Sequence, residues 1–243
     1  QQRLEPAERM AALTPLHGDP VRAVRIEAAH LLAPVASALA AQHRKGFDQA
    51  LAEFEATLAE NADRPESLAN LGNLYLSRGE VAHAETAYRE AISLDAHFVP
   101  AYVNLADLYR GGRRDADAER TLREGLRIAP NAAALREALG LALVRQGRKA
   151  EALAEFAAAA KAAPDEPRQA YVHAIALQDA GRGPEALRLL QATAQRSGDR
   201  DVLLALASFA SQAGDRAGAE KYLRALGAIN PDDPALPVPG ARR

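Results

Sequence analysis

Small and large apolar residues recur in this chain at fixed offsets about every 34 residues. Two of the units that show this share a Leu-Gly pair, a later glycine, an alanine and an aromatic residue: Leu71-Gly72, Gly79, Ala84 and Tyr88, then Leu139-Gly140, Gly147, Ala152 and Phe156. A period of this length is typical of stacked repeats, in which each unit packs mainly on its neighbours. The period therefore predicts a repeat array rather than one closed core.

The sequence pattern within each unit predicts two helices joined by a tight turn. Leu68, Leu71 and Tyr75 share one helical face, and Gly79 follows, where glycine can adopt the left-handed conformation of a helix C-cap. Equivalent turns are expected at Gly111-Gly112, Gly147, Gly181 and Gly214. Six units are expected, at 31–64, 65–98, 99–132, 133–166, 167–199 and 200–232; the first lacks the Leu-Gly pair and contains Pro34, and the fifth is one residue short.

The agreement of small, large and proline positions resembles the tetratricopeptide repeat family. The resemblance implies an all-α fold, an α-solenoid in which antiparallel helix pairs form a right-handed superhelix and the first helices line a concave groove. It covers residues 31–232 as an array of about six units. Residues 1–30 do not fit, but Asp19-Pro20, Val24-Arg25, Ala28 and Leu31-Leu32 resemble part of a HEAT-type repeat and predict a HEAT-like helical hairpin cap. Prolines and Gly240 predict a Pro-rich flexible tail over 233–243.

Composition excludes several classes of partner and site. The 30 basic and 32 acidic residues give a net charge of -2, which offers no general attraction to nucleic acid or anionic lipid. Charged residues interrupt every apolar run before it reaches the length of a membrane span. We therefore expect no nucleic acid partner and no membrane insertion. The absence of cysteine excludes thiol catalysis, thiolate metal sites and c-type haem attachment within this chain.

No arrangement of residues predicts catalysis. No two histidines have the i, i+3 or i+4 spacing that places two metal ligands on one helical face. Gly181-Arg182-Gly183 lies at a predicted helix–helix turn, whereas a dinucleotide-binding loop follows a strand. No serine lies in a Gly-x-Ser-x-Gly turn. We expect a non-enzymatic protein without cofactor or metal.

Polar residues on the first helices are the candidate binding residues. Asn70 and Asn104 occupy the same position in consecutive units, and Asn73 and Asp107 follow them three residues later on the same face. An Asn amide both donates and accepts, so such a ladder can pair with the backbone of an extended peptide. The arrangement resembles the asparagine ladder of some peptide-binding tetratricopeptide proteins. It extends over two rungs only, and the amides could instead bond to neighbouring helices and stabilise the stack.

Three further residues complete the candidate peptide-binding set. Arg110 and Arg145 lie near the ends of first helices, where they could contact an acidic ligand or be solvated. Tyr171 could present its ring in the groove or pack between units.

The leading functional interpretation is a scaffold that binds a peptide or partner protein in the concave groove. The alternative is an accessory interaction region of a larger enzyme, because segments such as Phe98–Tyr109 resemble the repeat region of bacterial multihaem cytochrome c proteins. That origin implies a periplasmic location, and a free-standing scaffold implies a cytoplasmic one. Self-association through the exposed array ends is a further expectation.

Overall fold

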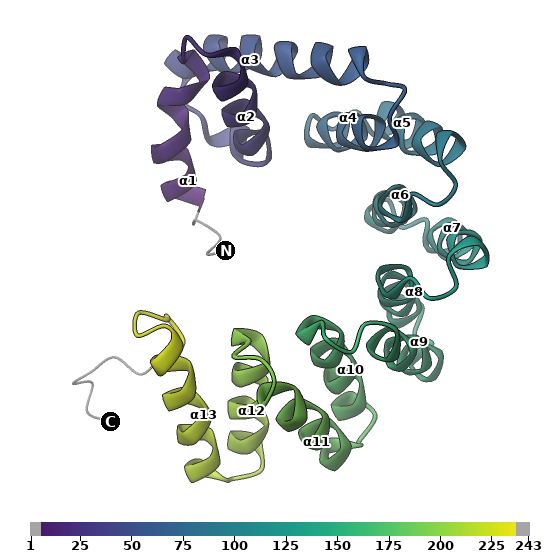
Figure 1. Cartoon of the computed structure of the whole chain (residues 1–243), viewed down its shortest axis with the longest axis vertical. Coiled ribbons are helices and arrows are strands. Elements are labelled where there is room, and N and C mark those ends of the chain that lie inside the picture. The colour runs from purple at the N-terminus through teal and green to yellow at the C-terminus, as the bar shows by residue number, and fades with distance from the viewer. Residues whose placement is uncertain (1–5, 237–243) are drawn as a thin grey trace. The chain divides into compact units, whose positions relative to one another are not determined.

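The computed structural model describes residues 6–236. Over this range it contains thirteen α-helices, two 3₁₀ helices and no strand (Figure 1). In chain order the α-helices are α1 Pro6–Leu13, α2 Arg22–Leu32, α3 Ala41–Glu60, α4 Pro65–Ser77, α5 Val81–Leu94, α6 Val99–Gly111, α7 Asp115–Ile128, α8 Ala133–Arg145, α9 Lys149–Ala162, α10 Pro167–Asp179, α11 Gly183–Ala194, α12 Arg200–Gln212 and α13 Arg216–Ile229. The chain divides into two compact units, Gln1–Arg114 and Asp115–Arg243, here called the N-terminal and C-terminal units.

The helix starts reproduce the sequence period. The first helices α4, α6, α8, α10 and α12 begin at residues 65, 99, 133, 167 and 200, and the second helices α5, α7, α9, α11 and α13 begin at 81, 115, 149, 183 and 216. Successive starts are 34 residues apart, except for the last interval of 33 in each series. The predicted all-α fold of repeated helices is confirmed.

Most intra-repeat turns contain a residue in the left-handed region. Gly79, Gly147, Gly181 and Gly214 have φ between 75° and 78°, a conformation that costs glycine no steric penalty. In the turn after α6 we expected Gly111-Gly112 in this role. The residue with positive φ is instead Arg113, at 59°, which occupies the position equivalent to Gly79.

The start of the N-terminal unit departs from the repeat. Where a helix pair was expected over 31–64, the chain forms a 3₁₀ helix, Ala33–Ala38, followed by the 20-residue helix α3. Pro34 lies in the first turn of the 3₁₀ helix, where its missing N–H is tolerated. Lys45 stands where later units have a left-handed turn residue, so α3 continues through this position. Phe47, Phe54 and Leu58 of α3 pack with Leu32 of α2 and Leu74 of α4 to form the core here.

Size complementarity holds the helix pairs together. In the N-terminal unit the Tyr88 ring lies against Gly72, and in the C-terminal unit the Phe156 ring lies against Gly140. A Cβ atom at either glycine would overlap the ring. The α10–α11 pair instead places Ala174 and Leu190 in one core cluster, and both are fully buried. A large ring is therefore matched by glycine, and a smaller leucine by alanine.

The segment that follows α13 is anchored, although we expected a flexible tail from residue 233. Arg200 of α12 donates to both carboxylate oxygens of Asp233 at 2.7 and 3.2 Å, and the Asp233 side chain is 1% exposed. Leu236 lies against Gly227 of α13. The rest of the predicted tail, with Pro237, Pro239 and Gly240, lies outside the described residues.

Candidate functional site

The predicted asparagines lie on two neighbouring first helices of the N-terminal unit. Asn70 and Asn73 belong to α4, and Asn104 belongs to α6, which contacts α4. Asn70 and Asn73 are exposed and Asn104 is half-buried. Asn70 and Asn73 lie one helical turn apart on α4, and Asn104 occupies the position of Asn70 one repeat later, so the three side chains share one surface.

Asn73 and Asn104 form a hydrogen-bonded pair between the repeats. The Asn104 amide Nδ2 donates to Asn73 Oδ1 at 3.2 Å. The same Asn73 oxygen accepts a hydrogen bond of 2.7 Å from the Tyr88 hydroxyl of α5. The two bonds occupy both lone pairs of this oxygen and fix the orientation of the Asn73 amide.

Tyr88 keeps its proton under ordinary conditions. Burial, together with the negative charge of Asp107, raises the pKa of Tyr88 to about 12. Its hydroxyl therefore remains a donor at neutral pH, and this directs the Asn73 oxygen toward the protein.

The amide groups that remain are complementary to a peptide backbone. Within residues 6–236, the Asn73 Nδ2 group donates to no protein acceptor, and the Asn104 Oδ1 accepts from no protein donor. The exposed amide of Asn70 likewise makes no side-chain hydrogen bond to the described part of the chain. Asn73 thus offers donors, and Asn104 offers an acceptor.

The charged candidates on α6 neutralise each other. Arg110 Nη2 lies 2.8 Å from Asp107 Oδ1, one helical turn away. An acidic ligand would have to compete with Asp107 for Arg110. The structure therefore gives Arg110 an intrahelical partner, which the sequence interpretation did not include.

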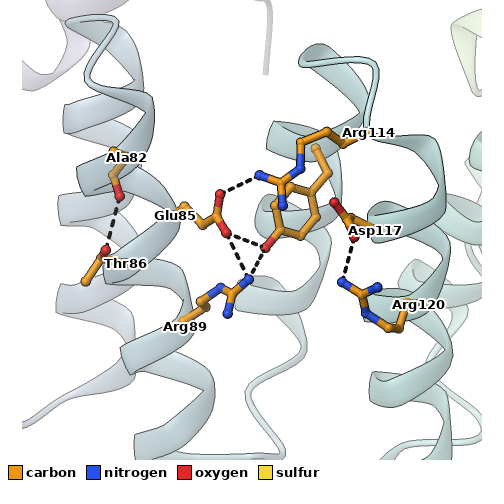
Figure 2. A network of polar contacts seen from close by, with 8 residues as sticks. Ala82, Glu85, Thr86, Arg89, Arg114, Asp117 and Arg120 are labelled. Atoms are coloured by element: carbon orange, nitrogen blue, oxygen red, sulfur yellow. Dashed lines mark hydrogen bonds and ion pairs between the residues drawn. The ribbon is translucent and has the colours of Figure 1, made fainter.

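A polar network joins α5 to α6 and to Arg114 in the loop after α6 (Figure 2). The Glu85 carboxylate accepts hydrogen bonds from Arg89 at 2.9 Å, Tyr109 at 2.8 Å and Arg114 at 2.8 Å. Arg89 also donates to the Tyr109 hydroxyl at 2.8 Å, and the Arg114 guanidinium lies 4.2 Å from the centre of the Tyr109 ring. These contacts fix how α6, and with it Asn104, lies against its neighbour.

The network stabilises the charged form of Glu85. Burial alone would raise the pKa of Glu85, but the hydrogen bonds from Tyr109 and Arg114 outweigh burial and hold the pKa below its usual range. Glu85, Tyr88 and Tyr109 were absent from the predicted site. Tyr88 and Tyr109 occupy packing positions of the repeat, and the repeat pattern carries no signal that their hydroxyls or the Glu85 carboxylate form hydrogen bonds.

Arg145 and Tyr171 lie in the C-terminal unit, where their surroundings differ. Arg145 Nε, at the end of α8, donates to Asp115 Oδ1 of α7 at 2.9 Å. Tyr171 of α10 is half-buried and lines a shallow depression of about 250 Å³ together with Leu204, Ser208 and Phe209 of α12. Tyr171 therefore lies on a surface formed by first helices, whereas Arg145 joins α8 to the preceding helix.

Among residues 6–236, no group of three or more His, Asp or Glu side chains is arranged to hold a metal ion. None of the helices described is both long enough and apolar enough to span a bilayer.

Comparison with protein families fits the helix-pair repeats. A tetratricopeptide repeat model matches residues 35–97 and 103–167, which is more than half of the chain, and a second tetratricopeptide model matches residues 177–236. The chain belongs to the tetratricopeptide repeat family. Proteins of this family are generally non-catalytic modules that bind other proteins or peptides. The HEAT-like cap and the multihaem cytochrome resemblance are not among these matches and stay predictions.

Solved tetratricopeptide structures share the fold. PilF of Pseudomonas aeruginosa is 21% identical, with a TM-score of 0.57 over 87% of this chain and 94% of that chain. MamA is 17% identical, with a TM-score of 0.54 over 72% and 98% of the two chains. YrrB, described as a TPR protein with an unusual peptide-binding site, is 22% identical, with a TM-score of 0.50 over 73% and 92%. No match was found among curated proteins. At these identities the likeness shows the fold alone.

Proposed function

We propose that this tetratricopeptide protein is a non-enzymatic interaction module that binds an extended peptide across α4 and α6. The observation that carries the proposal is the oriented pair of amides at Asn73 and Asn104, joined by the 3.2 Å hydrogen bond. Asn70, one turn before Asn73, adds a third exposed amide to the same surface.

The free amide atoms match what an extended peptide presents. A peptide in this conformation exposes a carbonyl oxygen and an N–H group at each residue along its edge. Asn73 can donate to a carbonyl, and Asn104 can accept from an N–H. Because these bonds involve the backbone, we expect affinity for many sequences, with specificity supplied by neighbouring side chains.

Preorganisation supports the proposal energetically. The Tyr88 hydroxyl and the Asn104 amide already hold Asn73 in one orientation. The binding site therefore loses little side-chain entropy when the ligand arrives. The Glu85 network limits the movement of α6 relative to α5 in the same way.

Peptides selected from a random display library on the full chain provide the test. Affinity is measured by fluorescence anisotropy for the parent protein and for Asn73→Asp. This variant keeps an oxygen that accepts from Tyr88 and Asn104, but it removes both donors. Loss of one to two backbone hydrogen bonds at about 1 kcal/mol each predicts roughly a 5- to 30-fold weaker complex.

Matched variants control for charge and folding. Asn131→Asp adds the same charge in the turn between α7 and α8, and we expect its affinity for the selected peptide to equal that of the parent. Asn73→Ala removes the amide without adding charge, and it should weaken binding at least as much as Asn73→Asp. Equal affinity of all four proteins would refute the site on α4 and α6.

A further inference from the structure

A second candidate surface lies in the C-terminal unit, on different helices from the proposed amide site. A mostly apolar cavity of about 210 Å³ lies between α8, α9 and α10. Its lining includes Val144, Leu153 and Phe156. Val144 is 44% exposed, so the cavity is open to solvent at this side. The only charged side chains in the lining are Lys149 and Asp179, and both are exposed.

One repeat earlier, at the junction of α7 and α8, polar contacts cover the position that is equivalent to the cavity. Asp115 and Arg145 lie 34 residues before Lys149 and Asp179, and they form an ion pair with 2.9 Å between Asp115 Oδ1 and Arg145 Nε. Beside this pair, Gln146 donates to Glu119 at 2.9 Å. Both contacts join α7 to the end of α8, so they cover the junction between these helices.

At the cavity neither contact can form in the same way, because different residues occupy the equivalent positions. The equivalents of Glu119 and Gln146 are Leu153 and Ala180, which cannot hydrogen-bond through their side chains. Lys149 and Asp179 carry the reversed charges, and neither forms an ion pair with any residue in the range 6–236. The junction therefore keeps an apolar opening with two unpaired, opposite charges beside it.

The size of the cavity limits what can fill it. Sites for drug-sized ligands usually exceed about 300 Å³, so 210 Å³ suits a single large apolar side chain. One side chain inserted into a small apolar pocket, with polar contacts around it, is a common anchor of protein interfaces. The opposite charges at the rim favour a partner that carries charges of both signs next to the anchor.

We propose that this cavity binds one leucine- or phenylalanine-sized side chain of a partner peptide whose flanking residues pair with Lys149 and Asp179. An acidic residue of the peptide faces Lys149, and a basic residue faces Asp179. The site is independent of the amides on α4 and α6, so either proposal can fail while the other holds.

A panel of synthetic peptides tests the proposal on the full chain. Each peptide has blocked ends, one Phe, and a Glu and an Arg on opposite sides of it, in both orders and at several spacings. Binding is followed by fluorescence anisotropy. Burial of the ring predicts that a Phe→Ala version of the tightest peptide binds about 10- to 150-fold more weakly.

Two protein variants locate the binding. The double variant Lys149→Asp with Asp179→Arg recreates the charges of Asp115 and Arg145 and leaves the net charge unchanged. The single variant Ala176→Leu fills the cavity from α10. Each variant should bind the peptide about tenfold more weakly or worse, while its far-UV circular dichroism spectrum stays the same.

Controls separate this site from general effects. Reversal of the exposed pair Arg182 and Glu185, by Arg182→Glu with Glu185→Arg, changes local charges without touching the cavity lining. It should leave the affinity unchanged.

Three results of the binding measurements would overturn the proposal. They are millimolar or weaker binding by every peptide of the panel, equal binding by the Phe→Ala peptide, and unchanged affinity in both cavity variants. A concentration-dependent dimer that Ala176→Leu dissociates, seen by sedimentation equilibrium, would also overturn it, because the occupant would then be a second copy of the chain.

Discussion

Replacement of Gly140 by alanine should destabilise the α8–α9 pair. The added Cβ would lie 2.7 Å from Phe156 Cδ1 and 2.8 Å from Cζ, distances at which the ring must move. Phe156 is 3% exposed and packed, so the movement disturbs its neighbours. Overpacking of this kind costs about 1 to 3 kcal/mol. The better helix propensity of alanine returns roughly 0.5 to 1 kcal/mol, so the middle of the two ranges leaves a net loss of about 1 kcal/mol.

Urea unfolding followed by far-UV circular dichroism measures this loss. With an m-value of about 2 kcal/mol/M, we expect the midpoint of Gly140→Ala to fall by roughly 0.5 M. Gly111→Ala is the matched control, because a Cβ at this last residue of α6 has no atom within 4 Å. Its stability should stay the same or rise by up to about 1 kcal/mol.

A second substitution tests the mechanism. Gly140→Ala with Phe156→Leu recreates the combination that Ala174 and Leu190 already form in the next pair. The double variant should be more stable than the sum of the two single effects predicts, by about 1 kcal/mol or more. Additive losses, or a Gly140→Ala variant as stable as the parent, would refute the size-matching argument.

Three further substitutions test single features. Arg113→Gly should raise the free energy of unfolding by up to about 1 kcal/mol, because it relieves a left-handed conformation; a loss would contradict this. Burial and then Arg182 lower the pKa of His173, so protonation favours the unfolded chain and stability should fall as pH drops below about 6.5. His173→Gln should reduce that fall in urea midpoints, compared with the parent between about pH 8 and about pH 5.5. As the pH falls below the usual pKa of a glutamate, protonation of Glu85 should remove its contribution to the free energy of unfolding. Tyr109→Phe should reduce this destabilisation at acid pH. Identical acid-unfolding midpoints for variant and parent would count against the network.

The sequence predicted the parts of the fold that depend on local pattern. Apolar periodicity shows where α4 to α13 lie, because each helix must bury its apolar face, and glycine marks four of the five turns within the helix pairs. At the start of the repeat region this information was misleading. Lys45 does not end a helix, and the segment before α3 that contains Pro34 forms only a short 3₁₀ helix. A single long α3 therefore replaces an expected pair.

The candidate site was predicted less completely, since polar contacts depend on three-dimensional detail. The repeat spacing was sufficient to place Asn73 and Asn104 on one surface, where they are hydrogen-bonded. It did not indicate that Tyr88 orients Asn73, or that Arg145 pairs with Asp115. Such pairs are set by side-chain length and direction, which a positional pattern does not contain.

The central functional claim is that the amides of Asn73 and Asn104 contact the bound peptide. The most direct measurement is an NMR titration of the ¹⁵N-labelled full chain with a peptide selected on it, followed through the side-chain amide signals of asparagine. We expect the Asn73 and Asn104 signals to shift and saturate together with binding. Saturated binding with both signals unmoved, and shifts confined to other helices, would contradict the account.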